Sequence, residues 1–165
     1  MSQTNRTYRG RDVLALVGIV AICYVPALIG YIASPEMGGA WYDALAKPDW
    51  TPPPWTFGTA WTALYAMMGL AAWLVWRCRD RANVRPALIA FGVQLALNAA
   101  WTPLFFGAHL IGAAFVELLV LLAAVVVTVV LFSRIRAMGT WLLVPYVGWL
   151  VFAALLNYAI WQMNM

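Results

Sequence analysis

Charged side chains are scarce in this sequence. Of its 165 residues, ten are Lys or Arg and six are Asp or Glu, which is 10% of the chain, while 65% of the residues are hydrophobic. Soluble domains carry roughly 25% charged residues, so this composition excludes an ordinary soluble domain. The net charge of +4 does not indicate a nucleic-acid partner, because the charges fall in breaks between apolar runs and not on one solvated face.

Cysteine and histidine are also few. Cys23 and Cys78 have no C-x-x-C spacing, and His109 is the single histidine, so we expect neither a metal site nor a required cofactor. The chain also lacks a nucleophile beside a base, paired carboxylates and a glycine-rich phosphate loop. Hydrolytic and phosphoryl-transfer chemistry is therefore not expected.

What the sequence does contain is long apolar runs. Five of them have the roughly 20 residues that a membrane-crossing helix needs: 12–33, 57–77, 85–106, 110–132 and 139–162. They predict an all-α integral membrane protein, a single domain over 1–165 folded as a five-transmembrane-helix bundle. The first run is too long for a cleaved signal peptide, and no small-residue cleavage site follows it. The connection 34–56 holds Pro48 and Pro52 to Pro54, which predicts an ordered lid loop with a short helix.

The basic residues are unevenly distributed between the connections. Nine of them precede the first span, join the second to the third, or join the fourth to the fifth, whereas Lys47 alone lies in an alternate connection. Because cytoplasmic loops retain Lys and Arg, we expect a cytoplasmic N-terminus. The lid loop, the turn at His109 and the C-terminus should then lie on the opposite side.

Aromatic residues are abundant, with ten tryptophans and seven tyrosines. Trp73, Trp76 and Trp141 fall at the basic ends of spans, where indole rings favour the headgroup boundary. That explanation does not cover Trp149, near the middle of the last span. It also does not explain the crowding of other tryptophans toward the opposite end of the bundle: Trp41, Trp50, Trp55, Trp61 and Trp101.

Polar residues at membrane depth share helical faces with these rings. The third span places Gln94, Asn98 and Trp101 on one face, the second places Trp61 and Tyr65 together, and the last adds Trp149, Ala153, Leu156 and Asn157. The amides could simply bond to neighbouring helices. Alternatively, they line a cavity open toward the non-cytoplasmic side, where the rings stack on a flat apolar ligand beneath the lid.

Two further residues stand out. Glu117 is the only acidic residue deep inside a predicted span, which suggests a ligand or proton role unless it lies at the membrane boundary. Small residues at spacing four, Ala96 with Ala100 and Ala108 with Gly112, could permit a homodimer.

Several motifs together resemble the TspO/MBR family, the tryptophan-rich sensory proteins related to mitochondrial translocator protein. In chain order they are Trp41-Tyr42, Leu45, Lys47-Pro48, Trp50, Pro52-Pro53, Trp55; Trp61, Leu64-Tyr65; Gln94-Leu95, Leu97-Asn98, Trp101, Pro103, Phe105-Phe106-Gly107; and Pro145-Tyr146, Trp149, Phe152-Ala153, Leu156-Asn157. The resemblance covers about residues 41 to 161.

The resemblance implies a five-helix bundle, commonly dimeric, that binds porphyrins such as protoporphyrin IX and, in relatives, sterols and benzodiazepine-type drugs. The residues expected to bind ligand are Trp41, Tyr42, Trp50, Trp61, Tyr65, Gln94, Asn98, Trp101, Trp149, Ala153, Leu156 and Asn157. Trp41 and Trp149 match tryptophans tied to light-driven porphyrin breakdown in bacterial relatives, and would be catalytic only in that case. His109 could contact a porphyrin carboxylate. A sterol is not expected, since Gln162 stands where the sterol pattern of animal members ends in a basic residue.

The expected function is that of a membrane receptor or binding protein for porphyrins, which senses, sequesters or transports tetrapyrroles under oxygen, light or stress. One alternative is an enzyme that degrades porphyrin photo-oxidatively, and another is a transporter of tetrapyrroles or other hydrophobic metabolites. The expected surroundings are a bacterial inner (cytoplasmic) membrane, with the outer membrane as the alternative. Expected partners are porphyrin, the lipid bilayer, drug-like ligands and a second copy of the chain.

Overall fold

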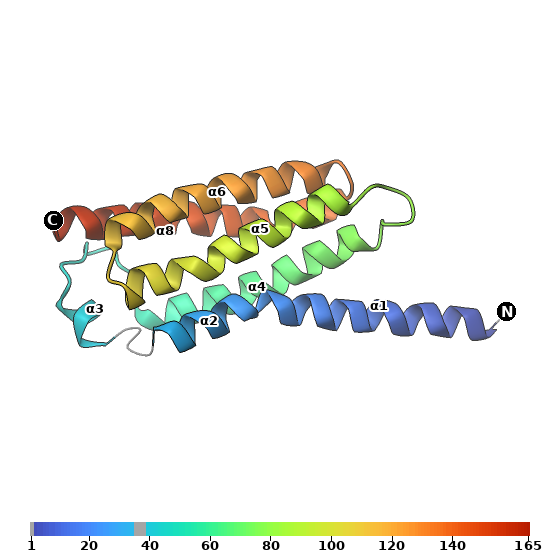
Figure 1. Cartoon of the computed structure of the whole chain (residues 1–165), viewed down its shortest axis with the longest axis horizontal. Coiled ribbons are helices and arrows are strands. Elements are labelled where there is room, and N and C mark those ends of the chain that lie inside the picture. The colour runs from blue at the N-terminus through green and yellow to red at the C-terminus, as the bar shows by residue number, and fades with distance from the viewer. Residues whose placement is uncertain (1, 35–38) are drawn as a thin grey trace.

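The computed structural model describes residues 2–34 and 39–165, and every regular element in them is helical. The elements are α1 (Ser2–Cys23), α2 (Val25–Ala33), α3 (Ala40–Ala44), α4 (Pro54–Trp76), α5 (Arg85–Thr102), the π-helical turn η1 (Pro103–Gly107), α6 (Ile111–Ser133), α7 (Ala137–Trp141) and α8 (Val144–Met163) (Figure 1). Five stretches are long and apolar enough to cross a membrane: Gly10–Ala33, Pro54–Trp76, Arg85–Gly107, Ile111–Ser133 and Ala137–Met163. The predicted all-α membrane protein with five spanning helices is confirmed.

The predicted ends of the spans differ from the observed ones by up to three residues. The second span was expected to start at 57, but α4 begins at Pro54, so the connection before it ends at Pro53. Proline is well tolerated in the first helical turn, because its missing N–H would have no partner there and its φ is already helical. A short helix, α3, lies in this connection as expected, and the predicted lid residues 35–38 lie outside the described residues.

Proline also interrupts three of the spans. The first divides into α1 and α2 at Tyr24, just before Pro26, and the last divides into α7 and α8 just before Pro145. At the end of α5 the chain widens into η1 at Pro103, whose carbonyl accepts a 2.8 Å bond from the Ala108 N–H. Each break follows from the missing N–H of proline, which cannot complete the helical hydrogen-bond ladder.

The helices pack around a buried centre formed by all five spans. α1 packs on α4, α2 on α5, α5 on α6 and α6 on α8, while α7 contacts both α4 and α6 and closes the bundle at one end (Figure 1). Met68, Leu121 and Leu150 are fully buried at its centre. Large apolar side chains such as Leu14 and Leu155 are 73% and 60% exposed, so the outer surface suits lipid better than water.

The two ends of the bundle differ in charge. The N-terminus and the α4–α5 and α6–α7 turns lie at one end, while α3, the α5–α6 turn and the C-terminus lie at the other (Figure 1). The first end carries the arginines with described side chains: Arg11, Arg77, Arg79, Arg81, Arg85, Arg134 and Arg136. Lys47 and His109 lie at the second end. Which end faces the cytoplasm stays a prediction.

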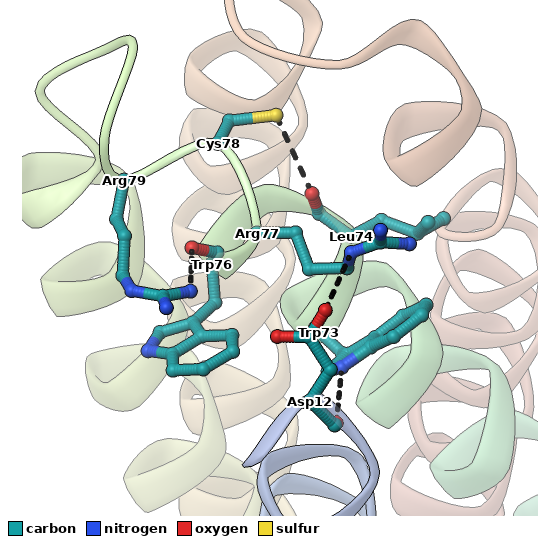
Figure 2. Close-up of polar contacts among 7 residues, drawn as sticks. All are labelled: Asp12, Trp73, Leu74, Trp76, Arg77, Cys78 and Arg79. Atoms are coloured by element: carbon teal, nitrogen blue, oxygen red, sulfur yellow. Dashed lines mark hydrogen bonds and ion pairs between the residues drawn. The ribbon is translucent and has the colours of Figure 1, made fainter. Parts of the chain in front are cut away.

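Polar contacts at the basic end fasten α1 to α4, as Figure 2 shows. The Trp73 Nε1 donates a 2.9 Å bond to the Asp12 carbonyl, and the Arg77 Nε lies 3.5 Å from the Asp12 carboxylate. The Arg79 guanidinium covers the Trp76 ring at 3.6 Å from its centroid. Trp73 and Trp76, interpreted from the sequence as boundary residues, therefore also hold helix ends and arginines in place.

Candidate ligand-binding site

Aromatic rings from the lid connection, α4 and α8 form one group, here called the α4–α8 aromatic cluster. Its members are Trp50, Phe57, Trp61, Tyr65, Trp149 and Phe152. Phe57, Trp61 and Tyr65 repeat every four residues and so share one face of α4. Trp149 meets that face, with its ring centroid 5.8 Å from Phe57 and 6.4 Å from Trp61. Trp50 packs on Phe152 at 5.9 Å, which joins the lid connection to α8.

Two grooves flank the first half of α4. A groove of about 330 Å³ separates α4 from α8 and is lined by Ala60, Ala63, Leu64, Met67, Pro145, Gly148, Trp149 and Phe152. A second groove, of about 680 Å³, lies between α4 and the first span and is lined by Tyr24, Trp55, Gly58, Thr59, Thr62, Ala63 and Ala66. Of the sequence-predicted ligand residues, Trp149 lines the first groove. Its indole N–H is buried and has no hydrogen-bond partner among the described residues.

Behind the aromatic cluster, a chain of hydrogen bonds joins α4, α5 and α8, and we call it the tyrosine–amide network. The Tyr65 hydroxyl donates to Asn98 Oδ1 at 2.8 Å, and Asn98 Nδ2 donates to the Tyr146 hydroxyl at 3.0 Å. Tyr146 in turn donates to Gln94 Oε1 at 3.1 Å. The interpretation of Gln94 and Asn98 as inter-helix bonding residues is confirmed. The Gln94 Nε2 group, however, is buried without a partner among the described residues.

The third intramembrane amide, Asn157, links α8 to the end of α5 and to the first residue of α6. Asn157 Nδ2 donates to the Ile111 carbonyl at 2.9 Å, and its Oδ1 accepts a 3.3 Å bond from the Trp101 indole. Trp101 also stacks on Phe105 at 5.2 Å between centroids. This amide therefore fixes the orientation of one predicted ligand-contacting indole.

A second aromatic group, the lid cluster, joins α3 to η1 and consists of Trp41, Tyr42, Trp101, Phe105, Phe106 and His109. The Trp41 and His109 rings are nearly parallel, 3.9 Å apart and inclined by 11°. His109 has a positive φ of 58°, a backbone conformation that side chains other than glycine rarely adopt. The stack on Trp41 is one contact that holds this strained residue in place.

The lid connection is also tied to the bundle by polar contacts. The Asn164 side chain accepts from the Ala46 N–H at 3.0 Å and donates to the Ala46 carbonyl at 2.9 Å. Lys47 donates to the carbonyls of Tyr42 and Leu45 and lies 4.7 Å from the Tyr42 ring centroid. Burial, with a smaller contribution from the neighbouring Asp43 carboxylate, raises the pKa of Tyr42. These contacts hold the segment that carries Trp41 and Tyr42 in a defined conformation.

The structure divides the predicted ligand residues between these groups. Trp50, Trp61, Tyr65 and Trp149 belong to the α4–α8 aromatic cluster; Trp41, Tyr42 and Trp101 belong to the lid cluster; Gln94 and Asn98 belong to the tyrosine–amide network. Leu156 packs in the same apolar cluster as Trp41 and Phe105, and Ala153 packs against the main core. Their contact with a ligand stays a prediction.

Tyr146 stands in one of the family motifs but was not predicted as a site residue, although it is fully buried at the centre of the network. The available signal was its position three residues before Trp149, on the same face of the last span. Phe57 and Phe105 were also not proposed as site residues, because phenylalanine is common in any apolar helix. Their spacing from Trp61 and Trp101, four residues in each case, was the signal for them.

Comparison with known proteins agrees with this architecture. Residues 16–162 match the TspO/MBR family. The chain is 38% identical over 151 residues to the translocator protein of Sus scrofa, covering 88% of this chain and 89% of that protein. It is 38% identical over 143 residues to protein CrtK of Rhodobacter capsulatus, covering 86% and 88%. A tryptophan-rich sensory protein of Cereibacter sphaeroides is 37% identical over 145 residues, covering 88% of each chain. This chain belongs to the TspO/MBR family.

Proposed function

We propose that this chain binds porphyrins such as protoporphyrin IX within the membrane, and that it senses, sequesters or transports tetrapyrroles. The observation that carries this proposal is the α4–α8 aromatic cluster, with its groove in front and the tyrosine–amide network behind. Relatives named translocator protein and tryptophan-rich sensory protein support a transporting or sensing role.

The chemistry of this site suits a flat apolar ring with a polar edge. Offset and edge-to-face aromatic contacts contribute about 0.5–1.5 kcal/mol each beyond area burial, and Trp61 and Trp149 already meet at 83°. The unpartnered indole N–H of Trp149 and the Nε2 of Gln94 can each donate to a ligand acceptor. The groove volumes, about 330 and 680 Å³, fall in the range of small-molecule sites, roughly 300–1,000 Å³.

A candidate partner for the porphyrin carboxylates lies at the lid end. His109 is exposed there, whereas the Lys47 ammonium is engaged by backbone carbonyls. No Lys or Arg lies inside α4, α6 or α8, so a carboxylate is disfavoured at mid-membrane depth. We therefore orient the ring toward the α4–α8 aromatic cluster and the carboxylates toward the lid.

Tryptophan-fluorescence quenching by protoporphyrin IX in the dark tests the proposal. We expect saturable quenching, with weaker binding in Trp149→Phe and Trp41→Phe. Trp141→Phe is the matched control, because Trp141 is 72% exposed at the far end of the bundle. Quenching that does not saturate, or that changes equally in all three variants, would refute porphyrin binding at this site.

A second candidate function is photo-oxidative porphyrin degradation. Trp149, Trp61 and Tyr65 form a row of oxidisable rings with centroids 6.4 and 5.3 Å apart, through which an electron could reach an excited porphyrin. Under light and oxygen, an enzyme would lose the porphyrin absorption band in a reaction that Trp149→Phe slows. A stable band in the wild type under light would leave binding without degradation.

Transport, a homodimeric state and a bacterial inner-membrane location remain proposals at this point. Porphyrin flux into liposomes tests transport, and light scattering of the purified protein tests the homodimer. Membrane fractionation with marker proteins tests which bacterial membrane holds the protein. A sterol is not proposed as ligand.

A further inference from the structure

Glu117 is a half-buried acid to which none of the contacts described so far gives a role. It lies in α6, which packs against both α5 and α8. Both of its carboxylate oxygens are buried, and neither has a hydrogen-bond partner among the described residues. An acid in this position differs from the three intramembrane amides, all of which bond to neighbouring helices.

The lack of a partner bears on the charge state of this carboxyl group. An ionised carboxylate without a counter-ion in apolar surroundings costs many kcal/mol, and such a group usually takes up a proton instead. A neutral carboxyl group carries one proton to donate and one carbonyl oxygen to accept. A neutral Glu117 side chain can therefore donate one hydrogen bond and accept another.

The tyrosine–amide network can form further hydrogen bonds. Glu117 lies within one helical turn of the fully buried Ala114 and Leu121, on the face of α6 that packs into the bundle. The helices packed against α6 include α5, which carries Gln94, and α8, which carries Tyr146. Tyr146 donates its single proton to Gln94 Oε1, and Gln94 Nε2 is a second buried group without a partner. A helix packed against α6 thus carries a buried donor without a partner among the described residues, and α6 itself carries an acid without one.

Few other titratable groups surround Glu117. Among the elements packed against α6, α5 carries only Arg85, at its first residue, and neither η1 nor α7 carries a titratable group. On α8 the titratable side chains are Tyr146 and Tyr158, and Tyr158 packs its ring on Phe115 at 5.3 Å. No base inside the spans competes with water for the Glu117 proton.

We propose that Glu117 is an intramembrane proton-binding site that forms one end of the tyrosine–amide network. With the proton bound, the neutral carboxyl donates into the network directly or through one water, and Tyr146 donates to Gln94. When the proton leaves to water, the carboxylate accepts from Tyr146 and Gln94 loses its donor. Only the O–H bond of the carboxyl breaks, and its proton goes to water. The Tyr146–Gln94 hydrogen bond is lost, while Asn98 still donates to Tyr146 and accepts from Tyr65.

Infrared difference spectroscopy of the ligand-free protein in lipid nanodiscs tests this proposal. At neutral pH we expect a carbonyl band of a neutral carboxylic acid that is lost in Glu117→Gln and shifts in D₂O. Glu117→Gln removes this one carboxyl group and leaves the other acids in place, so a band lost in that variant belongs to Glu117. Tyr146→Phe should shift the band, whereas Tyr158→Phe, on the same helix, should leave it unchanged.

The absence of a band that depends on Glu117 would overturn the proposal, as would a band that does not exchange in D₂O. A band unmoved by Tyr146→Phe would disconnect Glu117 from the network. If Tyr146→Phe does not fold, Gln94→Leu removes the acceptor of Tyr146 and serves the same purpose. These measurements contain no porphyrin, so failure of porphyrin binding and failure of this proposal give separate results.

Discussion

Asn98 is the single residue that connects the two tyrosines of the network. It accepts from Tyr65 and donates to Tyr146, so its loss leaves two buried hydroxyl groups short of a partner. We expect Asn98→Leu to cost about 1–2 kcal/mol, between the average for hydrogen bonds in membranes and the cost of unsatisfied buried groups. The Tm in detergent should fall by roughly 2–8 °C.

Thr59→Ala is the matched control for Asn98→Leu. The Thr59 hydroxyl is exposed and donates only to the Trp55 carbonyl in its own helix, so its removal should change the Tm little. An unchanged Tm for Asn98→Leu would mean that Tyr65 and Tyr146 find other partners, and that the network contributes no stability.

His109 combines two opposing effects that substitution can separate. Its φ of 58° costs about 1–3 kcal/mol for a residue with a side chain, while its stack on Trp41 contributes about 0.5–1.5 kcal/mol. His109→Ala keeps most of the strain and loses the stack, so the Tm should fall. His109→Gly loses both, so its Tm should lie above that of His109→Ala. The reverse order would show that the strain does not control this turn, and an unchanged Tm in His109→Ala would show the same for the stack.

At the scale of helices, the contact between α1 and α4 depends on the absence of a side chain at Gly69. A Cβ built there would lie 2.7 Å from Val20 Cγ2 and 2.8 Å from the Val20 Cα, and a backbone atom cannot move aside without shifting the helix. Gly69→Ala should therefore lower the Tm, although alanine favours helix by about 1 kcal/mol.

Gly92 in α5 provides the control for this prediction. A Cβ at Gly92 meets nothing within 4 Å, so Gly92→Ala should leave the Tm unchanged or raise it slightly. Equal effects of the two substitutions would show that α1 can move away from α4 at little cost.

The elements could be predicted from the sequence more completely than the contacts between them. Apolar runs and charge breaks predicted five spans, because a lipid-facing helix is apolar all round and needs no tertiary information. The start of α4 was misplaced, because a run of prolines is compatible with a loop and with the first turn of a helix. Tyr146 was missed because its importance comes from Asn98 and Gln94, residues 48 and 52 positions away. The division of the tryptophans into two clusters likewise follows from helix packing.

At the scale of the whole molecule, charge separates the two ends of the bundle. Arginines gather at the end that holds the N-terminus, and that end also fastens α1 to α4 through Asp12 and Trp73 (Figure 2). The lid cluster occupies the other end, where Lys47 is the only Lys or Arg among the described residues. Because short loops rich in Lys and Arg stay in the cytoplasm, the bundle should insert with the lid outside. A ligand would then enter from the non-cytoplasmic side or from the bilayer through the grooves beside α4.

Cysteine accessibility in intact bacterial cells tests this orientation. In a Cys78→Ser background the remaining Cys23 is fully buried and should not react. We expect a membrane-impermeant maleimide to label Ala44→Cys in intact cells, because Ala44 is exposed in α3. Ser133→Cys, exposed at the basic end of α6, should be labelled only after permeabilisation. Neither substitution changes the charge on which the orientation depends. The opposite labelling pattern would place the lid in the cytoplasm, and with it the His109 contact proposed for the ligand carboxylates.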